Sequence, residues 1–115
     1  MRRSILVVDD DGDLRSSIST VLAEAGYAID EAPNGADALT RVAAAAPDLI
    51  LLDLMMPEGS GWEVLERLRR DASRVPVIVI SAYASSLPTG ARALLRKPIH
   101  RDDLLASVRE HITSS

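Results

Sequence analysis

The sequence predicts an α/β fold, a doubly wound parallel sheet covered by helices on both faces. Three aliphatic runs, residues 5–8, 49–52 and 77–80, have the length and composition of strands buried on both faces. Segments with the helical spacing of apolar residues follow the first two runs. Strands that alternate with helices in this way indicate parallel pairing through right-handed crossovers.

Two weaker strands complete the predicted sheet. Residues 28–31 form an alternating segment, and residues 93–95 form a short run that leads into Lys97. The three most apolar strands should be central and these two should lie at the edges, which favours the strand order 2-1-3-4-5. In such a sheet the order reverses between strands one and three. Ligands bind at that switch point, at the carboxyl ends of the strands.

The expected helices have recognisable ends. Asp11 can cap the first helix, which Gly26 ends, and Asn34 can cap the second, which Pro47 ends. Gly61 opens the third helix. The last helix is amphipathic and has two acidic residues in its first turn, where the helix dipole favours them. Its inward face should comprise Leu104, Leu105, Val108 and Ile112.

Length and composition bound the function. With 115 residues, the chain is expected to form one domain, residues 1–115. It contains no cysteine, which excludes disulfides and thiolate metal sites. The formal net charge of -4 argues against a general electrostatic grip on nucleic acid. The aliphatic runs are too short for an export signal or a transmembrane helix, so we expect a cytoplasmic protein without membrane contact.

Acidic residues stand where two of the predicted central strands end. Asp9 and Asp10 follow the first strand, and Asp53 follows the third. The predicted topology makes these ends neighbours and brings Ser81 and Lys97 from the adjoining strand ends. Two unit charges ~4 Å apart repel by roughly 4 kcal/mol at an effective dielectric constant of 20. Three carboxylates beside one ammonium should therefore recruit a divalent cation or have raised pKa values.

This set of groups suits phosphoryl transfer. All-oxygen ligands favour Mg²⁺. Such a cation, together with Lys97 and the hydroxyl of Ser81, would hold the oxygens of a phosphoryl group. Asp53 is then the natural nucleophile, and an aspartyl phosphate is the expected product.

The order of these motifs resembles the receiver domain of bacterial two-component response regulators. The likeness covers almost the whole chain and implies a flavodoxin-like (βα)5 fold. It also implies a phosphorelay switch that takes a phosphoryl group from a histidine kinase or phosphotransfer protein and signals through protein contacts to an unknown downstream protein. Such a switch catalyses its own phosphorylation and dephosphorylation but is not an enzyme with an outside substrate. The matching motifs are Val8-Asp9-Asp10, Asp53 followed by Met56-Pro57 and Gly61, Ser81-Ala82, and Lys97-Pro98.

The resemblance implies a metal site and a phosphoacceptor. Asp53 would accept the phosphoryl group and also bind Mg²⁺. Asp10 would be a direct ligand, Asp9 would act through water, and the carbonyl of Met55 would complete the protein ligands.

The resemblance also assigns roles around the phosphoryl group. Ser81 would donate a hydrogen bond to it, and Lys97, in a cis peptide with Pro98, would pair with it. The small side chain of Ala82 would leave the path to the acceptor open. Met55 and Tyr83 occupy the two positions that tune the rate of phosphate loss in the family.

Two features depart from the family pattern. The position of the aromatic switch residue holds Leu94, and Tyr83 is a hypothetical replacement for that ring. Only 15 residues separate Ser81 from Lys97. After the last strand, about 11 residues remain for a crossover that normally needs a dozen or more. Since Pro88 and Gly90 are among them, we predict a fourth helix that is reduced to a turn or two, or absent, and an altered output face.

Two other functions stay open on the sequence alone. One is a small Mg²⁺-dependent phosphohydrolase of haloacid-dehalogenase type, because Asp9 and Asp11 form the Asp-x-Asp pair that such enzymes use. That reading leaves Asp53 without a role. The other is a receiver-like interaction module that no longer uses phosphate. The observation that favours it is the short crossover.

Overall fold

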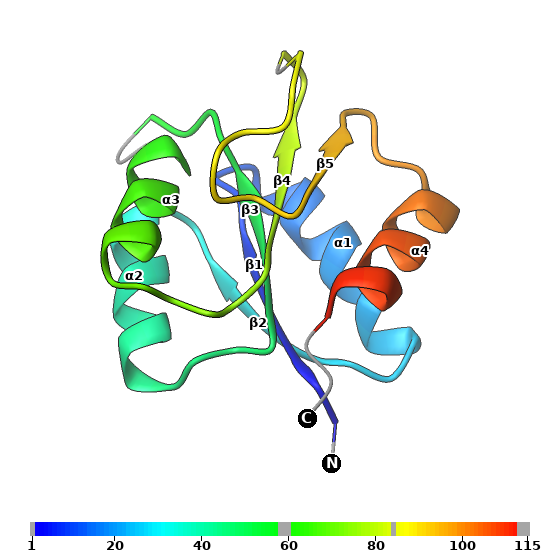
Figure 1. The fold of residues 1–115 in the computed structure, drawn as a ribbon. Coiled ribbons are helices and arrows are strands. Elements are labelled where there is room, and N and C mark those ends of the chain that lie inside the picture. Colours follow the sequence, from blue (N-terminus) through cyan, green and yellow to red (C-terminus); the bar gives the residue numbers. More distant parts are fainter. Residues whose placement is uncertain (1, 58–60, 84, 113–115) are drawn as a thin grey trace.

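The computed structural model describes residues 2–57, 61–83 and 85–112 and shows one parallel five-stranded sheet between two layers of helices (Figure 1). The strand order is β2-β1-β3-β4-β5, which confirms the predicted fold class and order. In chain order the elements are β1 (Ser4–Val8), α1 (Gly12–Glu24), β2 (Ala28–Ala32), α2 (Gly35–Ala44), β3 (Leu49–Asp53), α3 (Gly61–Arg70), β4 (Val77–Ser81), β5 (Ala93–Arg96) and α4 (Arg101–His111).

The register of the central strands sets the level of their carboxyl ends. Val8 of β1 pairs with Leu52 of β3, and Asp53 pairs with Ile80 of β4. The residue after β1 is therefore level with the last residue of β3. The strands β3 and β4 are buried along their whole length, as their unbroken aliphatic sequences predict.

Side-chain alternation along the strands divides the core into two halves. The side chains that face α2 and α3 include Leu6, Val8, Ile50, Leu52 and Val79. The side chains that face α1 and α4 include Ile5, Val7, Leu49, Leu51 and Ile80. Full burial of each such side chain contributes roughly 1.5–3 kcal/mol relative to exposure. The aliphatic core thus fixes the strand ends that carry the acidic residues.

The caps predicted for the first two helices are present. The Asp11 carboxylate accepts from the backbone N–H groups of Asp13 and Leu14 at 3.0 and 3.2 Å, and Asn34 accepts from the N–H of Asp37 at 2.8 Å. Gly26 has a φ of 102°, which suits the residue after a helix end. The helix α2 ends at Ala44, before Pro47, because the backbone at the following residue is already extended.

The final helix, α4, is amphipathic as predicted. Leu104, Val108 and Ile112 are buried, and Leu105 is partly buried against the same core. None of the helices in the described part of the chain is long and apolar enough to cross a membrane.

The connection from β4 to β5, residues 82–92, contains no helix in its described residues 82–83 and 85–92. The prediction of a shortened or missing fourth helix is thus confirmed for these residues. Pro88 is buried, and Ala91 packs against the core on the side of α2 and α3. The Arg92 N–H donates to Val77 O at 2.8 Å, which directs the chain into β5. Non-helical chain thus covers part of the sheet beside α3 (Figure 1).

Candidate functional site

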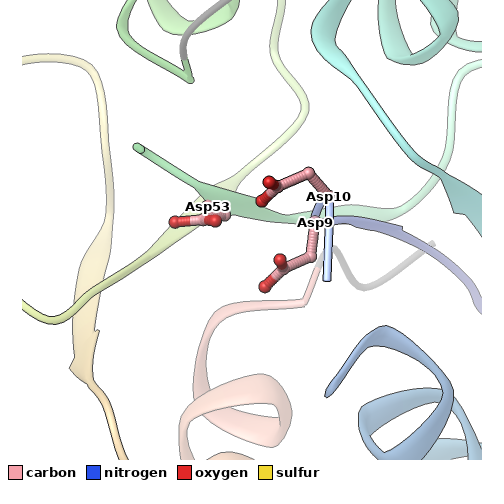
Figure 2. Close-up of side chains that lie close together, drawn as sticks. All are labelled: Asp9, Asp10 and Asp53. Carbon is pink, nitrogen blue, oxygen red and sulfur yellow. The ribbon is translucent and has the colours of Figure 1, made fainter. Parts of the chain in front are cut away.

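Three carboxylates meet at the carboxyl ends of β1 and β3. Carboxylate oxygens from Asp9, Asp10 and Asp53, one from each residue, all lie within 4.8 Å of one another. Figure 2 shows their side chains gathered at this edge of the sheet. Asp9 is fully buried and Asp53 is 2% exposed, whereas Asp10 is exposed. We call this group the acidic edge.

Lys97 supplies a cation to the acidic edge. Its Nζ lies 3.5 Å from an oxygen of Asp9 and 3.5 Å from an oxygen of Asp53. The Lys97 backbone N–H donates to Ser81 O at 3.1 Å, so the turn after β5 is tied to the end of β4. The peptide bond between Lys97 and Pro98 is cis, as the resemblance implies. The structure therefore brings Lys97 between the two buried carboxylates.

The Asp53 carboxylate is oriented from two sides. Its Oδ1 accepts from the Met55 backbone N–H at 3.1 Å, and its Oδ2 faces Lys97. Burial raises the pKa of Asp53 to about 6, the Met55 N–H lowers it, Asp9 raises it, and Lys97 lowers it. The carboxyl group is thus held in one orientation, in surroundings that penalise its charge.

The Asp9 carboxylate has one oxygen with an N–H donor and one without a hydrogen bond. The Oδ1 accepts from the Asp11 backbone N–H at 2.9 Å. The Oδ2 is buried and accepts no hydrogen bond from the described residues, and the nearest cation is Lys97 Nζ at 3.5 Å. Lys97 is shared with Asp53, so a metal ion would offset more of the desolvation penalty that this oxygen carries. Together with the surplus of carboxylates over Lys97, it indicates that these side chains fit Mg²⁺, which prefers oxygen ligands.

The remaining predicted residues surround the acidic edge. Ser81 ends β4 and is buried, and its Oγ accepts from the Tyr83 N–H at 3.1 Å. The side chains of Met55 and Tyr83 are exposed to 58% and 82%, and Ala82 is also exposed. The backbone N–H of Leu54 donates to the carbonyl of Ile80, which holds these two strand exits side by side.

Comparison with known proteins decides the family. Residues 5–109 match the response regulator receiver domain. The chain belongs to this family. Receiver domains accept phosphoryl groups from histidine kinases, and the function of this one is that of a phosphorelay signalling switch. The matches give no support to the phosphohydrolase alternative.

Curated relatives are similar over most of this chain. The response regulator MprA of Mycobacterium avium (strain 104) is 39% identical over 111 residues, which cover 91% of this chain and 49% of the relative. The transcriptional regulatory protein DltR of Streptococcus agalactiae serotype III (strain NEM316) is 36% identical over 111 residues, with 91% and 50% covered. The chain thus spans about half the length of these relatives.

Solved receiver structures have the same fold. The receiver domain of Francisella response regulator 1452 gives a TM-score of 0.89 at 32% identity and covers 95% of each chain. The chemotaxis protein CheY4 of Vibrio cholerae gives 0.87 at 28% identity, with 96% of this chain and 98% of that chain covered.

One residue of this receiver domain that the sequence analysis missed is Arg15. Its Nη1 donates to the backbone carbonyl of Asp9 at 2.7 Å, and its Nε donates to Glu31 at 2.9 Å. The guanidinium therefore ties the end of β1 to α1 and β2, one peptide away from Asp10. The sequence carries no clear signal for this role, since an arginine in the first turn of a helix is ordinarily solvated.

Gly61 positions the carboxyl end of β3, the central strand of the receiver. Its N–H donates to Leu54 O at 3.0 Å, so α3 begins directly against the chain that leaves β3. A Cβ at this position would overlap the carbonyl oxygen of Asp53 and would lie 2.6 Å from the Leu54 Cα. The glycine at the start of the helix is thus required by the close approach of two backbones.

Leu94 and Tyr83 occupy contrasting positions in the receiver. Leu94 lies in β5 opposite Val79, is partly buried, and packs against the core beside α2 and α3. Tyr83 has its side chain mostly in solvent. An aliphatic residue thus packs at the family's switch position.

Proposed function

We propose that this receiver domain accepts a phosphoryl group on Asp53. The observation that supports it best is the buried Asp53 carboxylate, which has Lys97 on one side and the Met55 N–H on the other. The environment opposes a permanent negative charge on the carboxylate and supplies donors to a phosphoryl group attached to it.

The proposed reaction exchanges one bond to phosphorus for another. An oxygen of Asp53 forms a bond to phosphorus while the P–N bond of a phosphohistidine breaks, and the imidazole leaves with the electron pair. Lys97 pairs with an oxygen of the transferred group, and the hydroxyl of Ser81 donates a hydrogen bond to another. Hydrolysis of the aspartyl phosphate by water resets the switch.

Asp9, Asp10, Asp53 and the carbonyl of Met55 would hold Mg²⁺, with Asp9 acting through water. When bound, the ion supplies positive charge to the phosphoryl oxygens. Asp9 and Asp10 contribute carboxylate oxygens beside the acceptor that would hold the ion, and Met55 contributes the N–H that orients the Asp53 carboxylate.

Residues that flank the acceptor control access to it in this proposal. Ala82 is small and exposed, so it leaves the approach of the donor open. Met55 and Tyr83 are long exposed side chains on neighbouring strand exits, where they can shield the phosphoryl group from water. We assign the rate of phosphate loss to these two positions.

The proposed partners are a histidine kinase or phosphotransfer protein upstream and an unknown protein downstream, with no direct contact to nucleic acid or membrane. We place residues 1–115 in one receiver domain that works in the cytoplasm. Its only catalysis would be its own phosphorylation and dephosphorylation. Because the curated relatives are about twice as long, the output of the whole protein is not assigned.

Phosphorylation by a small donor tests the proposal. Phosphoramidate contains the P–N bond of a phosphohistidine, so intact-protein mass is measured after incubation with phosphoramidate and Mg²⁺. The wild type is expected to gain one phosphoryl group, and Asp53→Asn or a chelator should prevent the gain. An equal gain in Asp53→Asn would contradict the assignment.

The helix-free connection from β4 to β5 favours one alternative, a receiver that binds its partner without phosphate. In that case the wild type gains no phosphoryl group from either phosphoramidate or a kinase, although circular dichroism shows the native fold. Partner binding would then be the same for the wild type and Asp53→Asn.

A further inference from the structure

A second charged site lies at the opposite end of the sheet from the acidic edge. It is a cavity of about 540 Å³. Two of its residues directly precede β1 and one directly precedes β2, so it lies at the amino ends of these strands, on the side of Figure 1 where the N-terminus is marked. The cavity is lined by Arg2, Arg3, Ala25, Gly26, Tyr27 and Arg109.

The lining of this cavity is strongly basic. Among the described residues, the lining contains three arginines and no acidic residue, although the whole chain has a net charge of -4. The neighbouring acids Glu24 and Glu110 are not part of the lining. Three exposed guanidinium groups around one cavity concentrate positive charge on this part of the surface, which attracts anions.

These guanidinium groups have unused donors. Among the described residues, the side chains of Arg2, Arg3 and Arg109 form neither an ion pair nor a hydrogen bond. By contrast, Arg15 and Arg41 are paired with carboxylates at 2.9 and 2.7 Å. The three guanidinium groups of the cavity therefore have no partner among the residues that the structure describes.

The end of α1 does not account for the three arginines. Arginines near a helix C-terminus can neutralise its exposed carbonyl groups. Here the carbonyls of Val21, Leu22 and Ala23 already accept from the N–H groups of the turn that follows. The end of α1 is therefore closed by its own backbone. Arg109 lies in the last turn of α4, where its charge complements that helix's dipole, but its N–H donors, like those of Arg2 and Arg3, have no partner among the described residues.

We propose that this cavity binds the polyphosphate group of a small anion. Guanidinium groups present N–H pairs whose geometry matches phosphate oxygens, and three of them suit a chain of phosphates. The cavity is open to solvent, since all of its lining residues except Tyr27 are exposed, so a hydrated polyphosphate can reach the guanidinium groups. A free polyphosphate and a nucleoside triphosphate share this chemistry. The partly buried ring of Tyr27 in the wall is where a nucleoside would make contact.

The polyphosphate site is separate from the phosphoacceptor. The strand β1 runs between them, and its five residues span about 17 Å at ~3.3 Å per residue. Binding should therefore be the same in Asp53→Asn, so a failure of this site and a failure of the proposed phosphorylation can be told apart.

Tripolyphosphate is the first probe, titrated into ¹⁵N-labelled protein with a chelator present so that no Mg²⁺ bridges it to the acidic edge. Saturable shifts are expected at the amides of Gly26 and Tyr27. Arg109→Gln and Arg3→Gln should each weaken binding roughly tenfold, since each removes a charge-assisted contact. Arg74→Gln, which changes another exposed arginine that has no ion pair with a described residue, should leave the affinity unchanged.

A second titration with ATP identifies the source of the anion. Equal affinity for ATP and tripolyphosphate means that the phosphates alone are recognised, and tighter binding of ATP means that the nucleoside contributes. The proposal is overturned by the absence of saturable binding, by equal affinity in folded Arg109→Gln and Arg3→Gln, by shifts at the acidic edge, or by binding of duplex DNA without binding of tripolyphosphate.

Discussion

The acidic edge and the β4–β5 connection lie next to each other but are built in opposite ways. At the acidic edge, the carboxylates of Asp9 and Asp53 are buried, and backbone N–H groups and Lys97 hold them in place. In the connection, Tyr83 and Leu87 are exposed to 82% and 52%, and no helix is present in the described residues.

This difference separates the chemistry of the receiver from its output surface. The positions of Asp9 and Asp53 depend on the register of β1 and β3, which the aliphatic core determines. The connection joins this framework at its two ends, through Ala91, and through a hydrogen bond that Arg96 of β5 donates to Ser85 O at 3.4 Å. Pro88 is the buried residue of its middle part. The crossover can therefore lose a helix while the phosphoacceptor keeps its surroundings.

The largest expected effect comes from Gly61→Ala at the acidic edge. A Cβ there would overlap the Asp53 carbonyl, and because both partners are backbone, the end of β3 or the start of α3 must move. We expect a loss of about 3 kcal/mol in the free energy of unfolding, measured by urea denaturation, and a large loss of phosphorylation.

Gly90→Ala is the matched change in the connection. Its Cβ would meet only side-chain atoms of Arg69 and Leu65, at 3.4 to 3.6 Å, so the cost comes from the φ of 95°. We expect a loss of about 1 kcal/mol in the free energy of unfolding and unchanged phosphorylation. A greater loss in the free energy of unfolding for Gly90→Ala than for Gly61→Ala would contradict the contrast between the two regions.

The raised pKa of Asp53 predicts a pH-dependent stability of the Mg²⁺-free protein. Burial raises this pKa from 3.8 to about 6. The protonated carboxyl therefore contributes to the free energy of unfolding in full below pH 3.8, and this contribution is lost as the pH rises through about 6. Asp53→Asn removes this dependence. Near neutral pH it should stabilise the Mg²⁺-free protein by on the order of 1–2 kcal/mol.

Urea unfolding at several pH values, with a chelator present, measures this effect. Asp71→Asn is the control, because the one side-chain partner of Asp71 among the described residues is Arg67, in an exposed ion pair. Addition of Mg²⁺ should stabilise the wild type more than Asp53→Asn. If the free energy of unfolding of the wild type instead rises between pH 3.8 and about 6, relative to that of Asp53→Asn, the acidic edge does not penalise the charged carboxylate.

Much of the acidic edge was predictable because the sequence itself indicates which segments form buried strands. The aliphatic runs before Asp9 and Asp53 fix the strands and their order, and that order places the two carboxylates side by side. The roles of Arg15 and Gly61 were not predictable in the same way. They depend on contacts between elements distant in sequence, such as the Arg15 bond to the Asp9 carbonyl and the approach of α3 to β3.

The helix ends show the same limit. Asp11 and Asn34 could be predicted as caps because a cap depends on neighbouring residues alone. The end of α2 at Ala44 could not, because the chain must leave the helix early enough for the Asp48 N–H to reach Ser4 O at 2.9 Å.

A smaller effect is expected from Arg15→Met, which keeps an apolar stem but removes the guanidinium. Because Glu31 already neutralises that charge, the loss is mainly one of positioning at Asp9. We expect Mg²⁺ affinity, measured by calorimetry, to fall roughly tenfold or less. Arg41→Met removes an arginine paired with Asp30 and Asp37, away from Asp9, and should leave the affinity unchanged. Equal losses in both variants would rule out a specific role for Arg15.

The smallest effect is expected from Tyr83→Ala in the connection. Since its side chain is mostly in solvent, the free energy of unfolding should change by no more than about 0.5 kcal/mol. If Tyr83 replaces the missing aromatic switch, its ring resonances should shift when the protein is phosphorylated. An unchanged Tyr83 environment would count against that role.

The most direct test of the account is to locate the phosphoryl group within the chain. Borohydride reduces an aspartyl phosphate to homoserine, and peptide mass spectrometry then identifies the modified residue. After phosphorylation with Mg²⁺ present, we expect homoserine at position 53 and at no other acidic residue. Modification at Asp9, the first residue of the Asp-x-Asp pair, would contradict the account and point back to the phosphohydrolase arrangement.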